Sequence, residues 1–154
     1  MAEHAPSLLL FARQQSRTEA DAQDLVQDAI VECWQRQRDG EPPPRPLVFA
    51  TIRRRAIDLA RTLDRRAQRE LVAGEEVLEC WFDPGVEDRE RARIVQSAMN
   101  QLPEIYREVI TLKLWGDLTF GEIAETLAIP ANTAASRYRY GLAELRELTR
   151  EVAA

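Results

Sequence analysis

The sequence contains few of the residues on which most enzymatic and metal chemistry depends. Its 154 residues include two cysteines, Cys33 and Cys80, and a single histidine, His4. Two separate cysteines cannot form a disulfide framework or a zinc site. One histidine leaves little scope for metal ligation, a catalytic triad or histidine acid–base catalysis. We therefore expect a protein that is not an enzyme and that uses no cofactor and no metal.

Long apolar runs are also missing. No run approaches the roughly 18 residues that a membrane-spanning helix needs, and the N-terminus lacks the basic and apolar regions of a secretion signal. Apolar residues make up 45% of the chain and charged residues 31%, which is the balance of a soluble globular protein. We therefore expect a cytoplasmic protein without membrane insertion.

Lysine is nearly absent, since 20 of the 21 basic residues are arginines and only Lys113 is a lysine. Arginine is well suited to paired hydrogen bonds with phosphates and with the edges of DNA bases. The base composition of a genome can produce the same bias. The arginine content alone therefore leaves a nucleic-acid partner open.

The formal net charge of −5 argues against a polyanionic partner only if the charge is evenly spread. Residues 1–44 carry four arginines against eight acidic residues, 45–69 carry eight against two, and 70–104 carry three against nine. Charges act mainly within a Debye length of roughly 8–10 Å, so this local balance decides which partners each segment attracts. The basic segment suits DNA, and the acidic segments suit a basic protein surface.

The N-terminal third of the chain shows helical periodicity. Thr18 followed by Asp21 resembles a capping box with Asp in place of the usual Glu. Behind these two residues, apolar positions recur at helical spacing from Ala22 to Trp34. The run includes Cys33, which we therefore assign to the core. Proline residues from Pro42 onward cannot continue the helical hydrogen bonds and end this helix.

Two further helices complete a predicted N-terminal module. A long helix is expected over residues 46–70, and a shorter one over 7–15 packs on the pair. The long helix has a regular apolar stripe, which we expect to be buried: Phe49, Ile52, Ala56, Leu59, Ala60 and Leu63. Its many arginines must then cover the exposed surface.

Residues 71–88 interrupt the helical pattern with glycine, proline and acidic residues, which is typical of a linker between domains. Trp81 and Phe82 are unusual for a solvated tether, and they dock either on one of the modules or on a partner. Convincing strand-like alternation is absent throughout. We therefore predict an all-α protein with two small helical domains, residues 1–70 and 89–154, joined by this linker.

Four helices are expected in the C-terminal domain. The third is short and begins with a capping box formed by Thr119 and Glu122. A tight turn follows, and Asn132 or Thr133 is expected to cap a last helix that runs to about Thr149. The inward stripe of this last helix is predicted to consist of Ala134, Tyr138, Leu142 and Leu145.

A short capped helix, a turn and a longer helix form the geometry of a helix-turn-helix, whose second helix enters the major groove of DNA. A helical hairpin in an ordinary bundle would have the same pattern. If the motif binds DNA, the contacts fall on the outward side of the last helix and include small, amide and basic side chains: Asn132, Thr133, Ala135, Ser136, Arg137, Arg139 and Tyr140.

The C-terminal sequence closely resembles region four of bacterial extracytoplasmic-function (ECF) sigma factors. The resemblance lies in residues 102–103, 107–110, 118–127 and 132–137. In that family, region four binds the −35 promoter element. The resemblance implies a four-helix module of this type at the C-terminus.

The N-terminal sequence resembles region two of the same family. Residues 22–28, with Trp34 further on, are similar to its polymerase-binding helix, and residues 56–61, followed by Arg65 and Arg66, are similar to its −10 element helix. Together the two similarities span nearly residues 7–149. Two matches in the right order are much more specific than a helix-turn-helix alone.

The resemblance implies a sigma factor that binds core RNA polymerase and directs it to −10 and −35 promoter elements. The expected partners are core polymerase, promoter DNA and an anti-sigma factor, with the chain a monomer when free or in the holoenzyme. The expected polymerase contacts are Asp24, Gln27, Asp28 and Glu32. The expected contacts near the −10 element are Arg53, Arg54, Arg55, Arg61, Arg65 and Arg66.

Two positions depart from the family pattern: Leu47 stands where tryptophan is common, and Arg54 stands where asparagine is common. Two other functions stay open. A stand-alone helix-turn-helix regulator would bind DNA without polymerase, but it would leave the acidic and basic N-terminal helices unexplained. A sigma mimic that sequesters an anti-sigma factor should lose the basic residues on its DNA-facing helices, which this chain keeps.

Overall fold

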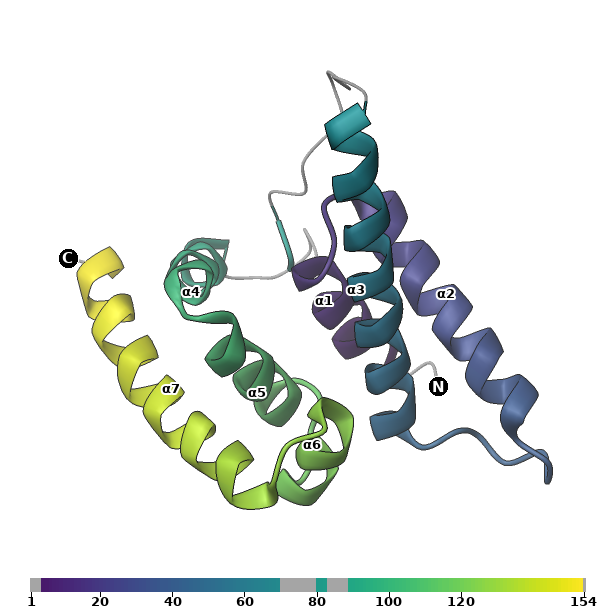
Figure 1. Ribbon diagram of the computed structural model, residues 1–154. Helices are drawn as coiled ribbons and strands as arrows, with labels where there is room; N and C mark the ends of the chain where they lie inside the picture. The colour runs from purple at the N-terminus through teal and green to yellow at the C-terminus, as the bar shows by residue number, and fades with distance from the viewer. Residues whose placement is uncertain (1–3, 70–79, 83–88, 154) are drawn as a thin grey trace. The chain divides into compact units, whose positions relative to one another are not determined.

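The computed structural model describes residues 4–69, 80–82 and 89–153. Within these ranges the chain forms helices and no strand, as the all-α prediction requires (Figure 1). The helices are α1 (Ala5–Gln14), α2 (Glu19–Arg36), α3 (Arg45–Arg69), α4 (Arg89–Gln101), α5 (Glu104–Leu114), α6 (Phe120–Leu127) and α7 (Ala131–Ala153). None of the described helices combines the length and apolar character needed to cross a bilayer. The chain divides into two compact units, Met1–Glu79 and Cys80–Ala154.

The N-terminal unit is a three-helix module built from α1, α2 and α3. Phe11 of α1 and Phe49 of α3 are completely buried, and their rings meet edge to face with centroids 5.4 Å apart. Arg13 at the end of α1 donates two hydrogen bonds of 2.8 Å to the two carboxylate oxygens of Glu19 in α2. An apolar centre and a bidentate ion pair therefore hold α1 against its neighbours.

The start of α2 follows the sequence prediction. The hydroxyl of Thr18 accepts a hydrogen bond of 3.1 Å from the Asp21 amide, which satisfies one of the amides left unpaired at a helix start. Cys33 is buried, with its sulfur 3.4 Å from the Thr51 hydroxyl, so its assignment to the core is confirmed. Cys80, in contrast, is exposed.

The apolar stripe of α3 is buried most completely in its first half. Phe49, Ile52 and Ala56 are buried, whereas Leu59 and Leu63 are half-buried. The helix is 25 residues long, against 18 for α2 and 10 for α1, and Figure 1 shows its C-terminal end extending beyond both. The second half of α3 therefore has less apolar surface to pack on.

In the C-terminal unit, α7 packs against α4, α5 and α6. Gly141 allows a close approach at this interface, because a Cβ atom there would lie 3.0 Å from Ile110 Cδ1 and from Tyr106 Cβ. The core of the unit is apolar: Ala98, Met99, Leu102, Val109, Ile110, Leu112, Leu118, Ile123, Leu127 and Ala134 are all buried. Because α7 is long enough to contact all three shorter helices, it holds them in one core.

The predicted start of α7 is wrong by two or three residues. The carbonyl of Pro130 accepts a hydrogen bond of 3.0 Å from the Ala134 amide, so the helix begins at Ala131. Asn132 and Thr133 therefore lie inside the first turn and do not cap it. The helix also continues past Thr149 to Ala153. Of its predicted inward stripe only Ala134 is fully buried, while the three larger side chains are half-buried.

Trp81 and Phe82 pack on the C-terminal unit, which settles where these two aromatic residues dock. The Trp81 amide donates a hydrogen bond of 3.0 Å to the Gln96 side chain, and the Arg107 guanidinium lies 5.7 Å from the Trp81 ring centroid. The Phe82 and Trp115 rings are 5.8 Å apart. These residues therefore belong to the folded C-terminal unit. Apart from Cys80, the rest of the expected linker lies outside the described residues.

Candidate nucleic-acid and protein interfaces

The helix-turn-helix predicted from the sequence is present in the C-terminal unit. Thr119 and Glu122 form a complete capping box at the start of α6, with reciprocal hydrogen bonds of 3.0 and 3.1 Å. At the other end of α6, Ala128 adopts a left-handed conformation with φ of 56° and turns the chain toward α7. Local capping at both ends thus sets the length of α6 and the position of the turn.

Aromatic packing joins the two helices of this motif. The rings of Phe120 in α6 and Tyr138 in α7 meet at 5.5 Å, and the Lys113 ammonium lies 4.7 Å from the centroid of the Phe120 ring. The single lysine of the chain therefore supports the motif from α5. These contacts fix how α7 is presented to a partner.

The predicted DNA contacts all lie on the first half of α7. Asn132, Arg139 and Tyr140 are exposed, and the others are half-buried: Thr133, Ala135, Ser136 and Arg137. The Arg139 guanidinium lies 5.1 Å from the centroid of the Tyr140 ring. In the described part of the chain, neither Arg137 nor Arg139 forms an ion pair with a carboxylate. The positive charges of these two arginines are therefore not balanced by an ion pair within the described part of the chain.

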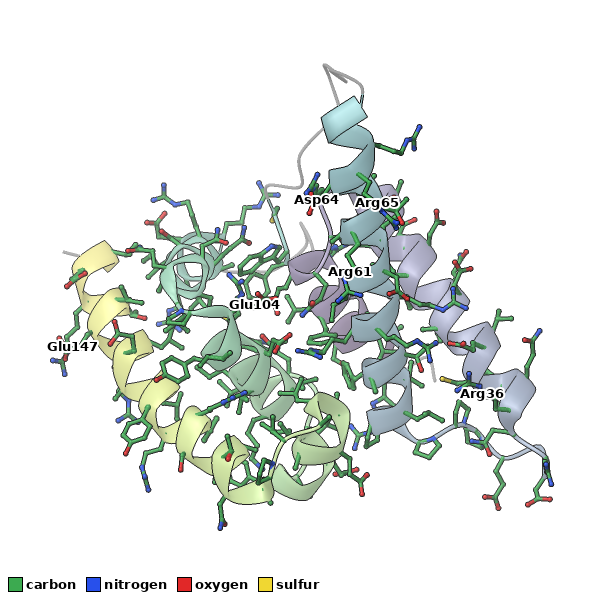
Figure 2. All side chains as sticks on the ribbon, viewed as in Figure 1. Arg36, Arg61, Asp64, Arg65, Glu104 and Glu147 are labelled. Carbon is green, nitrogen blue, oxygen red and sulfur yellow. The ribbon has the colours of Figure 1, made fainter. Side chains whose placement is uncertain are left out.

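The second half of α3 carries another group of exposed arginines, Arg61, Arg65 and Arg66. Figure 2 shows Arg61, Asp64 and Arg65 together on this part of the helix. Asp64 forms an ion pair with Arg17, which precedes α2. One of the two acidic residues of α3 is thus already neutralised, and the net character of this surface is basic.

The first half of α3 is different, because two of its predicted DNA-contacting arginines meet acidic side chains of α2. Arg54 Nη2 lies 2.7 and 2.6 Å from the two carboxylate oxygens of Glu32. Arg55 Nε lies 3.4 Å from Glu32, and Arg55 Nη1 lies 3.8 Å from Asp28. Residues predicted to bind polymerase and residues predicted to bind DNA are therefore joined to each other.

The carboxylate of Glu32 responds to this environment. Its partial burial disfavours the charged form, but the positive charges and hydrogen bonds of Arg54 and Arg55 outweigh that effect and lower its pKa. Glu32 therefore stays ionised at any pH near neutrality. Its negative charge is available to hold both arginines.

The remaining acidic face of α2 is exposed and contains two apolar residues. Asp24, Gln27 and Asp28 are exposed, and next to them 54% of Val31 and 40% of Trp34 are accessible. Trp34 continues the predicted apolar spacing but is exposed, because the helix turns by about 100° per residue and so directs Trp34 away from the side of the buried Cys33. Large exposed apolar residues on a charged helix face are typical of a protein interface.

Sequence reasoning therefore missed Val31 as a candidate contact. A signal for it was present: Val31 lies four residues after Gln27 and three after Asp28, so all three share one side of α2. An apolar residue within an otherwise acidic face is out of place unless something covers it. We add Val31 and Trp34 to the candidate protein interface.

The fold and these surfaces define a helical protein of two modules, of which the second presents a helix-turn-helix. The family described as sigma-70 region 2 matches residues 1–66, and the family described as sigma-70 region 4 matches residues 92–152. The chain is 30% identical over 141 residues to the RNA polymerase sigma-E factor of Streptomyces avermitilis, covering 92% of this chain and 78% of that protein. The chain therefore belongs to the sigma-70 family of RNA polymerase sigma factors, in its ECF group.

Two further similarities agree with this assignment. The chain is 28% identical over 146 residues to the ECF RNA polymerase sigma factor RpoE of Cereibacter sphaeroides, covering 93% of this chain and 80% of that protein. Its fold matches the sigma factor RpoE of Bartonella quintana, solved in complex with the anti-sigma factor NepR, with a TM-score of 0.75 and 23% identity over 94% of this chain and 91% of that one. The predicted family and fold are thus confirmed.

Proposed function

We propose that this chain is a transcription initiation factor that binds core RNA polymerase and directs it to promoters with −10 and −35 elements. It acts by binding, without catalytic chemistry of its own, and it does so in the cytoplasm. The observation that carries the proposal is the presence of both sigma-70 regions in order on one chain. A stand-alone regulator needs only the second of these regions.

Recognition of the −35 element is assigned to the first half of α7. Small side chains at Ala135 and Ser136 let the helix approach the bases, and Arg139 can bridge the O6 and N7 atoms of guanine. Stacking of Arg139 beside Tyr140 restricts the arginine before DNA arrives. Asn132 and Arg137 are placed to bind bases or flanking phosphates.

Binding near the −10 element is assigned to α3. Each phosphate that an arginine neutralises releases counterions, which favours binding and makes it depend on salt. Arg61, Arg65 and Arg66 are exposed and are therefore available for such contacts. Arg53, Arg54 and Arg55 extend the same surface toward the start of the helix. Energy from these contacts supports capture of the opened strand.

Binding of core polymerase is assigned to the exposed face of α2. Asp24, Asp28 and Glu32 supply negative charge, and Gln27 supplies a hydrogen-bonding amide. Val31 and Trp34 supply the apolar area that most protein interfaces bury at their centre. A basic polymerase surface with an apolar patch complements this face.

An anti-sigma factor is proposed as the third partner, after core polymerase and promoter DNA. The structure most relevant here is the Bartonella quintana sigma factor, which was solved with its anti-sigma factor bound. By analogy, a protein that covers α2 or α7 would keep this chain from polymerase or from DNA. We expect the free chain to be a monomer.

The proposal is tested by run-off transcription with core polymerase and genomic promoter fragments. The wild-type chain should bind core enzyme and start transcripts at specific positions. In Asp28→Arg, the reversed charge should reduce affinity for core polymerase by tenfold or more. Glu151→Arg reverses an exposed charge at the end of α7 and serves as the matched control.

Failure of the wild-type chain to bind core polymerase would overturn the proposal. DNA binding without any effect of polymerase would indicate a stand-alone regulator. Binding to an anti-sigma factor without binding to DNA would indicate a sigma mimic. Equal core affinity of Asp28→Arg and Glu151→Arg would remove Asp28 from the polymerase interface.

A further inference from the structure

Glu32 sits where the two proposed surfaces of the N-terminal unit meet. Its side chain is 19% accessible, and its carboxylate accepts Arg54 Nη2 on both oxygens, at 2.7 and 2.6 Å. Arg55 Nε approaches the same carboxylate at 3.4 Å, and Arg36 Nη2 at 3.3 Å. One carboxylate of α2 thus gathers three guanidinium groups, two of them from α3.

This cluster is locally neutral on the side that faces α3. The charges of Glu32 and Asp28 together cancel those of Arg54 and Arg55. A phosphate approaching this half of α3 meets carboxylates that already occupy some of the arginine donors. To bind the phosphate, Arg54 and Arg55 must first release the carboxylates of Glu32 and Asp28. Arg61, Arg65 and Arg66 face no such exchange with Glu32 or Asp28 among the described contacts.

We propose that Glu32 is a positioning residue that neutralises Arg54 and Arg55 in the free protein, and that a cationic group on the protein partner of α2 takes over its carboxylate and releases both arginines for DNA. The inference rests on the proposed function, in which α2 binds polymerase and α3 binds promoter DNA. By linkage, DNA bound to α3 strengthens the partner's hold on α2 by the same factor.

The size of the coupling follows from the exposure of the groups. The side chain of Arg54 is 50% accessible and that of Arg55 is 36% accessible, so water screens both ion pairs and each is weak. Coupling between sites is commonly 5- to 150-fold. Because the ion pairs are weak, we expect an effect at and just below the lower end of this range, about 3- to 10-fold in DNA affinity.

The test compares two single charge removals in the free, full-length chain. Glu32→Gln keeps the shape of the side chain and removes the charge that holds the arginines. Asp58→Asn removes an equal charge from α3 itself, where Asp58 is exposed and its carboxylate has no ion pair within the described part of the chain. Affinity for a fluorescent DNA duplex of arbitrary sequence is measured by anisotropy over a range of salt concentrations.

Glu32→Gln should bind this duplex about 3- to 10-fold more tightly than Asp58→Asn does. The slope of log affinity against log salt should steepen by about 1 to 2, as expected for one or two additional phosphate contacts. In a background of Arg54→Ala and Arg55→Ala, the advantage of Glu32→Gln should disappear. Equal affinities of the two variants, or an advantage that persists in that background, would overturn the inference.

A second comparison leaves α2 unaltered and so does not depend on the folding of Glu32→Gln. If Arg54 and Arg55 are neutralised in the free chain, replacing both with alanine should reduce duplex affinity less than twofold. Replacing Arg61 and Arg65 with alanine should reduce it several-fold. Equal losses would contradict the inference.

These measurements use neither polymerase nor a promoter. If the wild-type chain binds core polymerase and initiates transcription while Glu32→Gln behaves like Asp58→Asn, only the coupling fails. If the wild-type chain does not bind core polymerase, the proposed function fails whatever the duplex affinities are. The two failures are therefore distinguishable.

Discussion

The two modules hold their predicted DNA-contacting arginines in different ways. In the C-terminal unit, Arg139 stacks beside Tyr140 and has no carboxylate partner among the described residues. In the N-terminal unit, Arg54 and Arg55 are bound to Glu32 on the neighbouring helix. Arg139 is available to DNA in the free protein. Under our proposal, Arg54 and Arg55 become available only when a cation of the protein partner takes their place beside Glu32.

The same difference explains how a chain with a formal net charge of −5 can bind DNA. The excess negative charge is not spread over the basic helices. Part of it faces outward on α2, and part of it is used inside the N-terminal unit to balance α3. Net charge is therefore a poor guide to the partner of either module.

The largest expected effect is a loss of stability in the N-terminal unit alone. Phe11→Ala removes a completely buried ring from the N-terminal core and should reduce the free energy of unfolding of that unit by about 3–5 kcal/mol. Hydrogen exchange measured by mass spectrometry should show faster exchange in α1, α2 and α3 and unchanged protection in α4 to α7. Loss of protection in both units would show that they unfold as one.

The next effect concerns Arg139 of α7, which packs beside Tyr140. Arg139→Ala should weaken binding to the preferred −35 sequence by about 1–3 kcal/mol and relax the choice of base at one position. Binding assays with promoters that differ at single −35 positions measure this discrimination. Arg146→Ala, an exposed arginine further along α7, is the matched control. An equal loss on every promoter sequence would instead identify Arg139 as a phosphate contact.

A smaller effect compares the threonine caps of the two units. Thr119 takes part in a complete capping box, whereas the hydrogen bond described for the cap at Thr18 runs in one direction, from the Asp21 amide. Alanine at either threonine should cost about 1 kcal/mol, with the larger loss at Thr119. Chemical denaturation of each variant gives the two values. A larger loss at Thr18 would reverse the ranking.

The smallest effect is a pH dependence of the stability of the N-terminal unit. The hydrogen bond from Arg13 lowers the pKa of Glu19 despite the opposing effect of burial, and the pKa of Glu32 is lowered as well. A lowered pKa in the folded state stabilises the fold above the unfolded value of about 4.3, and this stability is lost as pH falls through the folded value. Glu19→Gln should remove about 0.5–1 kcal/mol at neutral pH, in the upper part of the range for exposed pairs, because the side chain of Glu19 is 40% accessible while that of Arg13 is only 10% accessible.

Unfolding curves of wild type and Glu19→Gln at pH 7 and pH 3 provide the check. The difference in stability between the two proteins should shrink at the lower pH, because Glu19 is then partly protonated in the wild type. A difference that is the same at both pH values would contradict an ionic contribution from Glu19.

The sequence predicted those features that depend on residues close together in the chain. The cap at Thr18 and the capping box at Thr119 were both predicted because each involves residues three positions apart. The start of α7 was missed by the same local reasoning. Asn132 and Thr133 are good caps by residue type, but Pro130 already ends the turn and its carbonyl starts the helix.

Features that depend on how helices rotate against each other were not predictable. Glu32 and Arg54 are 22 residues apart, and helical periodicity gives each a face but not a neighbour. The docking of Trp81 and Phe82 was open for the same reason, since no sequence pattern tells which module covers them. The proposed contacts on α2, α3 and α7 remain predictions that the experiments above address.

The placement of Trp34 and Trp81 allows binding at α2 to be followed by the intrinsic fluorescence of the chain. Trp34 is 40% accessible on the face of α2 proposed to meet polymerase, whereas Trp81 is 7% accessible and lies beside Arg107. Tryptophan emission shifts to shorter wavelength when water leaves the ring. The emission of Trp34 should therefore shift to shorter wavelength when a partner covers α2. The emission of the buried Trp81 in the other unit should stay unchanged and serve as an internal reference.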